Sequence, residues 1–184
     1  MTVVTVLPRR PLTVDDLDAM PDDGHRYELI DGTLIVSPAP LLRHQLVHSR
    51  LMHLLLNAAP ADLQVLSAPT DIVLADDTVV QPDLLVAPLA QIVGRKLMEP
   101  PLLAVEILSP SSRLIDLNLK RARYERAGVP SYWVVDPDEL RLVAWRLSEG
   151  VYVDVADVAP DETWRAADPF EVVVTPRDLA AGAG

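Results

Sequence analysis

Two apolar stretches, Val79-Val80-Gln81-Pro82-Asp83-Leu84-Leu85-Val86 and Leu102-Leu103-Ala104-Val105-Glu106-Ile107-Leu108, each carry a single acidic residue. Runs this short, apolar and bounded by turn residues are typical of buried strands. Asp and Glu are almost never fully buried unless their charge is compensated, and two convergent carboxylates can bind a hard divalent cation. The two stretches therefore predict a metal-dependent hydrolytic site that contains Asp83 and Glu106.

The composition is that of a globular protein. The chain has 184 residues, of which 49% are hydrophobic and 23% charged, which argues against disorder. We expect a single domain with its core over about residues 13–174 and a flexible tail over 175–184. No apolar stretch approaches the ~18 residues that span a bilayer, and residues 1–11 contain no secretory apolar region, so a cytoplasmic protein with no membrane association is expected. The absence of cysteine excludes disulfides, thiolate zinc sites and a cysteine nucleophile.

The net charge of −11 argues against attraction of nucleic acid by the overall field of the protein. The charge is uneven, because residues 136–171 hold ten acidic and three basic residues, whereas residues 113–126 hold five basic and two acidic ones. A local basic surface on an acidic body is therefore still possible.

The order of the predicted elements favours an α/β fold. Helical spacing predicts helices, alternation and apolar runs predict strands, and Asp31-Gly32 is a strong hairpin signal. Helices are expected at 13–20, 42–58 and 113–127, and strands at 27–30, 33–36, 70–75, 79–86, 102–108, 131–135, 141–147 and 151–155. This order is typical of a mixed sheet with helices packed against it.

The helix after Glu106 carries a candidate catalytic lysine. At 100° per residue, Leu117 and Tyr124 nearly coincide, and Lys120 lies about 40–60° from that apolar edge. Its ammonium can therefore turn toward the sheet and approach Glu106. The alternative is an exposed i,i+4 ion pair with Asp116. Two carboxylates that hold Mg²⁺, with a lysine that orients water or stabilises developing charge, are suited to cutting a phosphodiester bond.

Several motifs carry a family resemblance. Pro82-Asp83, Glu106-Ile107-Leu108 and Lys120 resemble the PD-(D/E)XK nuclease superfamily. Over roughly residues 13–147, the chain resembles the Uma-type restriction endonucleases. The motifs that carry this wider resemblance are Tyr27-Glu28-Leu29-Ile30-Asp31-Gly32, Gln81-Pro82-Asp83-Leu84-Leu85, Val105-Glu106-Ile107-Leu108-Ser109-Pro110-Ser111 and Tyr132-Trp133-Val134-Val135-Asp136-Pro137.

The resemblance implies a restriction-endonuclease-like α/β/α fold and Mg²⁺-dependent cleavage of DNA, with Mn²⁺ able to substitute and a homodimer expected by analogy. It implies that Asp83, Glu106 and the backbone carbonyl of Ile107 are metal ligands, and that Glu28 is a further ligand or a base. The superfamily pattern has lysine two residues after the glutamate, where this chain has Leu108. The Uma-type pattern moves that lysine to the following helix, at Lys120. Gln81 is expected to have only a supporting role.

The histidines of the second predicted helix give only weak support for a zinc site. His44 and His48 are spaced i,i+4, but the zinc protease motif needs glutamate where Gln45 stands, so zinc is not expected. His44 could instead contact the active site or a phosphate, while His48 and His53 are expected on the helix surface.

The basic and aromatic residues leave a further choice open. The basic residues of the third predicted helix fit DNA contact or a solvated helix about equally well; they are Arg113, Lys120, Arg121, Arg123 and Arg126. Trp133 lies in a predicted buried strand and is expected in the core.

Two other functions compete with that of an endodeoxyribonuclease. The first is a catalytically inert nuclease-fold domain that serves as a protein-interaction module, which the acidic composition favours. The second is a metal-dependent hydrolase of small phosphoesters. The first predicts no response to Mg²⁺, and the second predicts turnover of small substrates without affinity for duplex DNA.

Overall fold

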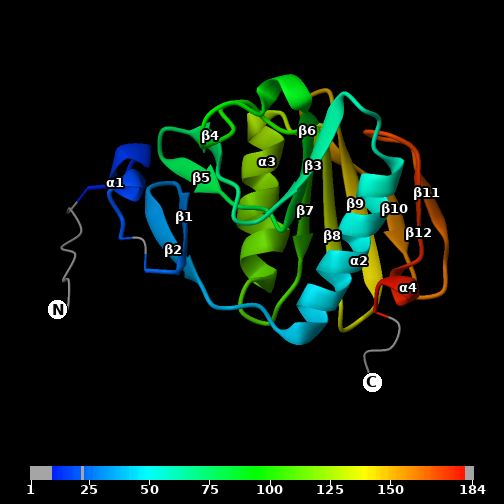
Figure 1. The fold of residues 1–184 in the computed structure, drawn as a ribbon. Helices are drawn as coiled ribbons and strands as arrows, with labels where there is room; N and C mark the ends of the chain where they lie inside the picture. Colours follow the sequence, from blue (N-terminus) through cyan, green and yellow to red (C-terminus); the bar gives the residue numbers. More distant parts are fainter. Residues whose placement is uncertain (1–9, 22, 181–184) are drawn as a thin grey trace.

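The central sheet has six strands: β3 (Leu63–Ser67), β6 (Leu84–Pro88), β7 (Leu103–Ile107), β8 (Ser131–Asp136), β9 (Arg141–Ser148) and β10 (Val151–Val158). This computed structural model describes residues 10–21 and 23–180, and the strand order is β10-β9-β8-β7-β6-β3 (Figure 1). β7 and β8 are parallel, and the other neighbouring pairs are antiparallel. The prediction of a mixed central sheet is confirmed.

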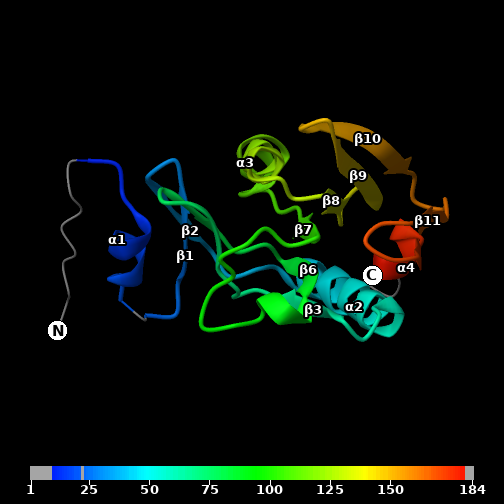
Figure 2. The same cartoon turned by 90° about the horizontal axis from the view of Figure 1, so that it is seen from above.

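Helices cover both faces of the central sheet. Helix α2 (Leu42–Ala58) lies on one face, and helix α3 (Arg121–Ala127) lies on the other (Figure 2). Successive residues of a strand point to opposite faces, so Val105 and Ile107 pack in the cluster with α2, whereas Ala104 packs in the cluster with α3. The same alternation directs Glu106 toward the α3 side. The predicted α/β/α layering is therefore confirmed.

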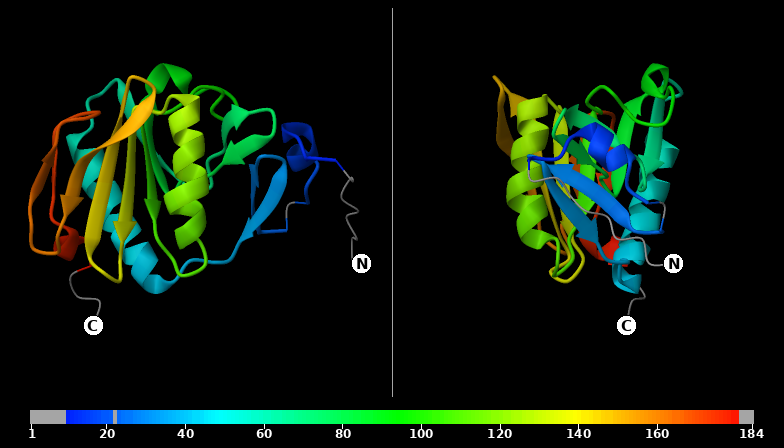
Figure 3. Two further views of the ribbon diagram at one scale, coloured as in Figure 1. Left: turned by 180° about the vertical axis from the view of Figure 1, so that it is seen from behind. Right: turned by 90° about the vertical axis from the view of Figure 1, so that its left-hand side faces the viewer.

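A smaller sheet lies beside the central one. Its strands are β1 (Arg26–Ile30), β2 (Thr33–Ser37), β4 (Ile72–Ala75) and β5 (Thr78–Val80), in the order β2-β1-β5-β4. Together with helix α1 (Val14–Asp18), they occupy one side of the molecule (Figure 3). The predicted hairpin is confirmed at Asp31-Gly32, where both residues have positive φ, at 51° and 71°. Such a turn matches the twist of the flanking strands.

The stretch 79–86 is divided between the two sheets, which the sequence did not predict. Its first part belongs to β5 in the small sheet, and its last part belongs to β6 in the central sheet. Pro82 lies at the crossing, and it has no N–H to donate to a sheet ladder. Asp83 consequently precedes β6 instead of lying within a strand.

The helix predicted at 113–127 is present but has an unexpected first part. Residues Ile115–Lys120 form a π-helical segment, η2, which continues into α3. The helix ends at Gly128, whose φ of 83° is the left-handed conformation that favours glycine at this position. The predicted stop at Gly128 is therefore correct.

Five short elements were not predicted from the sequence. They are β3, the 3₁₀ helix η1 (Leu89–Gln91), β11 (Trp164–Ala166), β12 (Val172–Val174) and α4 (Pro176–Ala180). The expected flexible tail is wrong for residues 176–180, because α4 buries Leu179 and Ala180 against the α2 side of the core. The expectations about the N-terminal segment and the end of the tail also depend on residues 1–9 and 181–184. These residues lie outside the described part of the chain. None of the helices in the described ranges combines the length and hydropathy needed to cross a membrane.

Candidate active site

The ammonium group of Lys120 lies at the centre of a buried acidic cluster. Its Nζ is 2.8 Å from Glu28 Oε1, 3.1 Å from Glu106 Oε1 and 3.6 Å from Asp116 Oδ1. These four side chains are at most 4% exposed. Three carboxylates around a single ammonium hold it in one position, and the solvated alternative for Lys120 is wrong.

Asp116 and Lys120 both point inward from the π-helical segment. Residues four apart share one face of a helix, so the two side chains reach the same buried cluster. The Tyr132 hydroxyl donates to the Asp116 carbonyl oxygen at 2.9 Å in the buried interior, which fixes this turn against β8. π-bulges are frequent at functional sites. The sequence indicated Asp116 only as an ion-pair partner of Lys120 and missed its place in the cluster.

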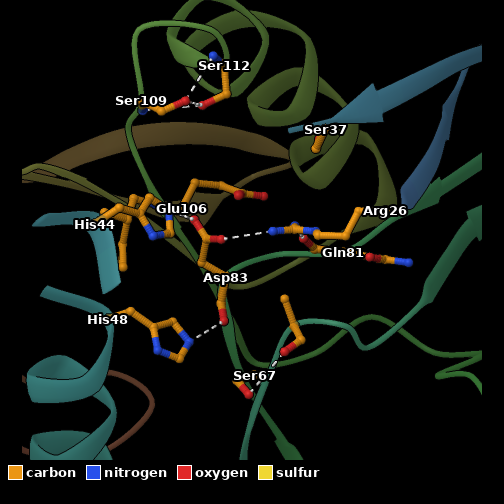
Figure 4. A network of polar contacts seen from close by, with 12 residues as sticks. Arg26, Ser37, His44, His48, Ser67, Gln81, Asp83, Glu106, Ser109 and Ser112 are labelled. Carbon is orange, nitrogen blue, oxygen red and sulfur yellow. Dashed lines mark hydrogen bonds and ion pairs between the residues drawn. The ribbon is translucent and has the colours of Figure 1, made fainter. Parts of the chain in front are cut away.

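Asp83 is held by groups from three different elements. Its Oδ2 accepts a hydrogen bond from the Ile107 N–H at 2.8 Å and lies 3.1 Å from His44 Nε2, while Arg26 Nη1 is 3.4 Å from Oδ1 (Figure 4). Burial alone would raise the pKa of Asp83, but His44, the Ile107 N–H and Arg26 together lower it below its ordinary value. Asp83 is therefore a carboxylate at neutral pH.

The histidines of α2 differ in position. His44 is buried and contacts Asp83, as expected for a residue near this site. His48, predicted on the helix surface, is half-buried, and its Nε2 is 3.1 Å from the carbonyl oxygen of Asp83 (Figure 4). His53 is exposed, as predicted. The i,i+4 spacing of His44 and His48 indicated that both lie on one face of the helix. The sequence could not show that this face meets Asp83.

Glu106 is buried against Lys120 and Tyr124. The Tyr124 hydroxyl donates to Glu106 Oε1 at 2.9 Å, and the sequence gave this tyrosine no role beyond the apolar helix edge. Burial raises the pKa of Glu106 well above its ordinary value, against the opposing effect of Lys120 and with further increases from Asp116, Asp83 and Glu28.

The backbone N–H groups of Gln81 and Ile107 each donate a hydrogen bond to a carboxylate of the site. The Gln81 N–H donates to Glu28 Oε1 at 2.7 Å, and its side-chain amide donates to Asp71 Oδ1 at 2.7 Å. Ile107 is the last residue of β7 and pairs with Val135 of β8, while its N–H donates to Asp83 Oδ2.

A single pocket with a cavity volume of about 340 Å³ is lined by the four carboxylates together with Arg26, His44, Ile107 and Lys120. Its floor has four carboxylates, and the cations beside them are Lys120 and Arg26. The pocket therefore has an excess of acidic over basic side chains, and Asp116 Oδ1 has no hydrogen-bond partner. A divalent cation would offset this excess.

The donor set is one that a hard divalent cation can use. Within the part of the chain that the structure describes, no three His, Asp or Glu side chains form a group arranged to hold a metal ion. Mg²⁺, however, is usually bound through one or two carboxylates and keeps several waters. Asp83, Glu106 and the Ile107 carbonyl match that requirement. The structure brings the predicted site residues to one pocket, and their metal-binding and catalytic roles stay predictions.

Four of the five basic residues predicted on the third helix contact other residues of the protein, and the fifth, Arg126, is exposed. Arg113 pairs with Asp136, Arg123 pairs with Asp31, and the Arg121 guanidinium lies 4.7 Å from the centroid of the Trp145 ring. Lys120 is buried in the acidic cluster. Trp133 is 1% exposed, so its predicted place in the core is confirmed.

Comparisons with known proteins agree with this arrangement. A family model described as Uma2, putative restriction endonuclease, matches residues 14–180. The search of curated proteins gave no match. Among solved structures, the fold is similar to that of a putative nuclease belonging to DUF820 from Anabaena variabilis, with a TM-score of 0.76 and 19% identity. That alignment covers 93% of this chain and 98% of the Anabaena chain.

Proposed function

The chain belongs to the Uma2 family of putative restriction endonucleases, and on that basis we propose that it is a metal-dependent phosphodiesterase, specifically an endodeoxyribonuclease. The observation that carries the proposal is the Lys120 ammonium, which lies 2.8 Å from Glu28 and 3.1 Å from Glu106 in the pocket that Asp83 also lines. Acidic side chains beside a fixed ammonium supply the groups needed to hold a divalent cation and to stabilise a phosphoryl transition state.

We assign Asp83, Glu106 and the Ile107 carbonyl to binding of Mg²⁺, with Mn²⁺ as a substitute. When bound, the ion would lower the pKa of water and neutralise charge on the phosphoryl group. Asp83 is suited to this role because its pKa is lowered, so the carboxylate is available at neutral pH. Tyr124 and the Ile107 N–H keep the two carboxylates in fixed positions before the ion arrives.

Lys120 is assigned to charge stabilisation and not to proton abstraction. Burial disfavours its ammonium form, but Glu106, Glu28 and Asp116 outweigh that effect and raise the Lys120 pKa above its ordinary value. A lysine that stays protonated donates hydrogen bonds, so it can orient the attacking water and stabilise the developing oxyanion. Glu28, held by the Gln81 N–H, keeps the ammonium in place.

Nicking of supercoiled plasmid in Mg²⁺ or Mn²⁺ tests the proposal. Asp83→Ala and Glu106→Ala should each abolish nicking while the circular dichroism spectrum stays that of the wild type. Asp154→Asn is the matched control, because Asp154 is an exposed carboxylate on β10 and its loss should leave nicking unchanged. Nicking that survives Asp83→Ala would refute the proposed site.

The same preparation distinguishes the competing functions. An inert interaction module predicts that Mg²⁺ changes neither Tm nor nicking. A hydrolase of small phosphoesters predicts turnover of bis(p-nitrophenyl) phosphate with no cleavage of DNA. A homodimer would allow both strands to be cut, and sedimentation velocity measures whether the chain forms one.

A further inference from the structure

We propose that Arg26 binds a phosphate of the DNA substrate, and that it is released for this purpose when a divalent cation takes its place at Asp83. This inference rests on the proposed function and adds a substrate-binding residue to the site. Three observations carry it: the loosely held oxygen of Asp83, the unused donor of the Arg26 guanidinium and the exposure of the Arg26 side chain.

The two carboxylate oxygens of Asp83 are held differently. Oδ2 accepts a hydrogen bond from the Ile107 N–H at 2.8 Å and lies 3.1 Å from His44 Nε2. Within the described part of the chain, the partner of Oδ1 is Arg26 Nη1, at 3.4 Å (Figure 4). A strong charge-assisted hydrogen bond between nitrogen and oxygen is about 2.7–2.9 Å long. A cation that binds Oδ1 therefore replaces the longest of these three contacts and leaves the other two intact.

The Arg26 guanidinium is anchored at one nitrogen and has a donor to spare. Its Nη2 donates to the Gln81 carbonyl oxygen at 2.7 Å, whereas Nε is buried and has no hydrogen-bond partner among the described residues. A buried donor without a partner costs free energy, which favours a shift that supplies one. After Nη1 leaves Asp83, the bond to Gln81 still holds the guanidinium beside the pocket. The planar fork of N–H groups in arginine matches the oxygens of a phosphate.

Arg26 is the most exposed of the basic side chains that line the pocket. It is 24% exposed, against 9% for His44 and 4% for Lys120. Arg26 also lines a second cavity of about 860 Å³, so it borders open space beyond the acidic pocket and has room to move. A phosphate that enters from solvent therefore meets Arg26 before it meets Lys120.

The acidic side chains of the pocket set the order of the two binding events. Four carboxyl side chains line the pocket together with Arg26, and negative charges this close repel a phosphate. Once a divalent cation offsets this repulsion, Asp83 Oδ1 no longer needs the guanidinium as its partner. Arg26 thus stabilises Asp83 before the cation is present and turns to the substrate afterwards.

Two measurements on Arg26→Gln test the inference. Cleavage of a duplex oligonucleotide in Mn²⁺ gives kcat/KM, and calorimetric titration with Mn²⁺ in the absence of DNA gives the Kd of the ion. We expect kcat/KM to fall by about 10²-fold, because a donor to the phosphate is lost. Mn²⁺ should bind roughly 5-fold more tightly, because a positive charge no longer competes for Asp83.

Two further variants complete the test. Arg26→Lys should cleave at an intermediate rate, because lysine keeps the charge but not the planar fork. Arg141→Gln is the matched control, because Arg141 is an exposed arginine of β9 that pairs with Asp157 and does not line the pocket. It should change neither measurement. Circular dichroism checks that each variant folds, and Arg26→Lys carries the comparison by itself where Arg26→Gln does not fold.

Each outcome bears on the inference. Slower cleavage with Mn²⁺ binding as tight as in the wild type, or tighter, supports it. Mn²⁺ binding that weakens together with cleavage shows that Arg26 only holds Asp83 in position, and it overturns the inference while the proposed function stands. Cleavage at the wild-type rate in Arg26→Gln overturns it as well. Absence of cleavage by the wild type with either ion refutes the proposed function itself, and the inference falls with it.

Discussion

Replacing Lys120 with methionine should destabilise the protein strongly, and more at high pH than at low pH. Methionine keeps the length of the side chain but removes the charge that lies between Glu28, Glu106 and Asp116. Breaking a buried ion pair by removing one partner costs about 3–5 kcal/mol, because the remaining charge is left uncompensated. For a domain of this size, that corresponds to a loss of roughly 6–20 °C in Tm.

The pH dependence follows from the direction of the pKa shifts. The pKa values of Glu106 and Asp116 are already raised in the wild type, mainly by burial, and removal of the ammonium raises them further. A group with a raised folded-state pKa contributes stability below its unfolded pKa and loses it as the pH rises through the folded value. The deficit of Lys120→Met relative to wild type should therefore be small near pH 4 and largest near pH 8.

Urea denaturation at pH 4, 6 and 8, without added metal, measures this deficit. Lys96→Met is the matched control, because Lys96 is the other lysine of the chain and pairs with Asp18 and Asp71 nearer the surface, where such pairs contribute about 0–1 kcal/mol. A Lys120→Met deficit that is independent of pH, or no larger than that of Lys96→Met, would refute the electrostatic reasoning.

Three further changes have defined outcomes. Tyr124→Phe removes the donor to Glu106 Oε1; it should lower the free energy of unfolding by about 1–3 kcal/mol and weaken Mn²⁺ binding by about 10-fold in a calorimetric titration. Gly128→Ala should cost about 1 kcal/mol in urea denaturation because alanine disfavours φ of 83°, although nothing lies within 4 Å of the added carbon. Mg²⁺ at 100 times its Kd should stabilise the wild type by about 2.7 kcal/mol, and Glu106→Gln should abolish this thermal shift.

Local patterns in the sequence predicted the central part of the fold. The apolar run around Glu106, the Asp31-Gly32 turn and the helix that ends at Gly128 all depend on neighbours in the chain, and each was found where expected. The inward direction of Lys120 also followed from its angle to the apolar edge of the helix. These features are set by periodicity and turn chemistry, which a sequence displays directly.

Other features depend on partners that are distant in the chain. The division of 79–86 between two sheets depends on which strands pair with each half, so the run alone could not show it. Arg26 joined the site because β1 pairs with β5, and His48 is half-buried because the Asp83 carbonyl lies opposite it. The π-helical segment carries no composition signal distinct from an ordinary helix. Short strands such as β11 are stabilised by packing and fall below the length at which alternation can be recognised.

Two of the four carboxylates of the pocket come from different sheets, since Glu28 belongs to β1 of the small sheet and Glu106 to β7 of the central sheet. Proteins open in cooperative segments whose opening free energies can be well below that of global unfolding. Partial detachment of the N-terminal strands would withdraw Glu28 and Arg26 while α2, α3 and the six-stranded sheet stayed folded. Inactivation by mild heating or low urea should then precede loss of ellipticity, and amide protons of β1 should exchange with deuterium earlier than those of β7.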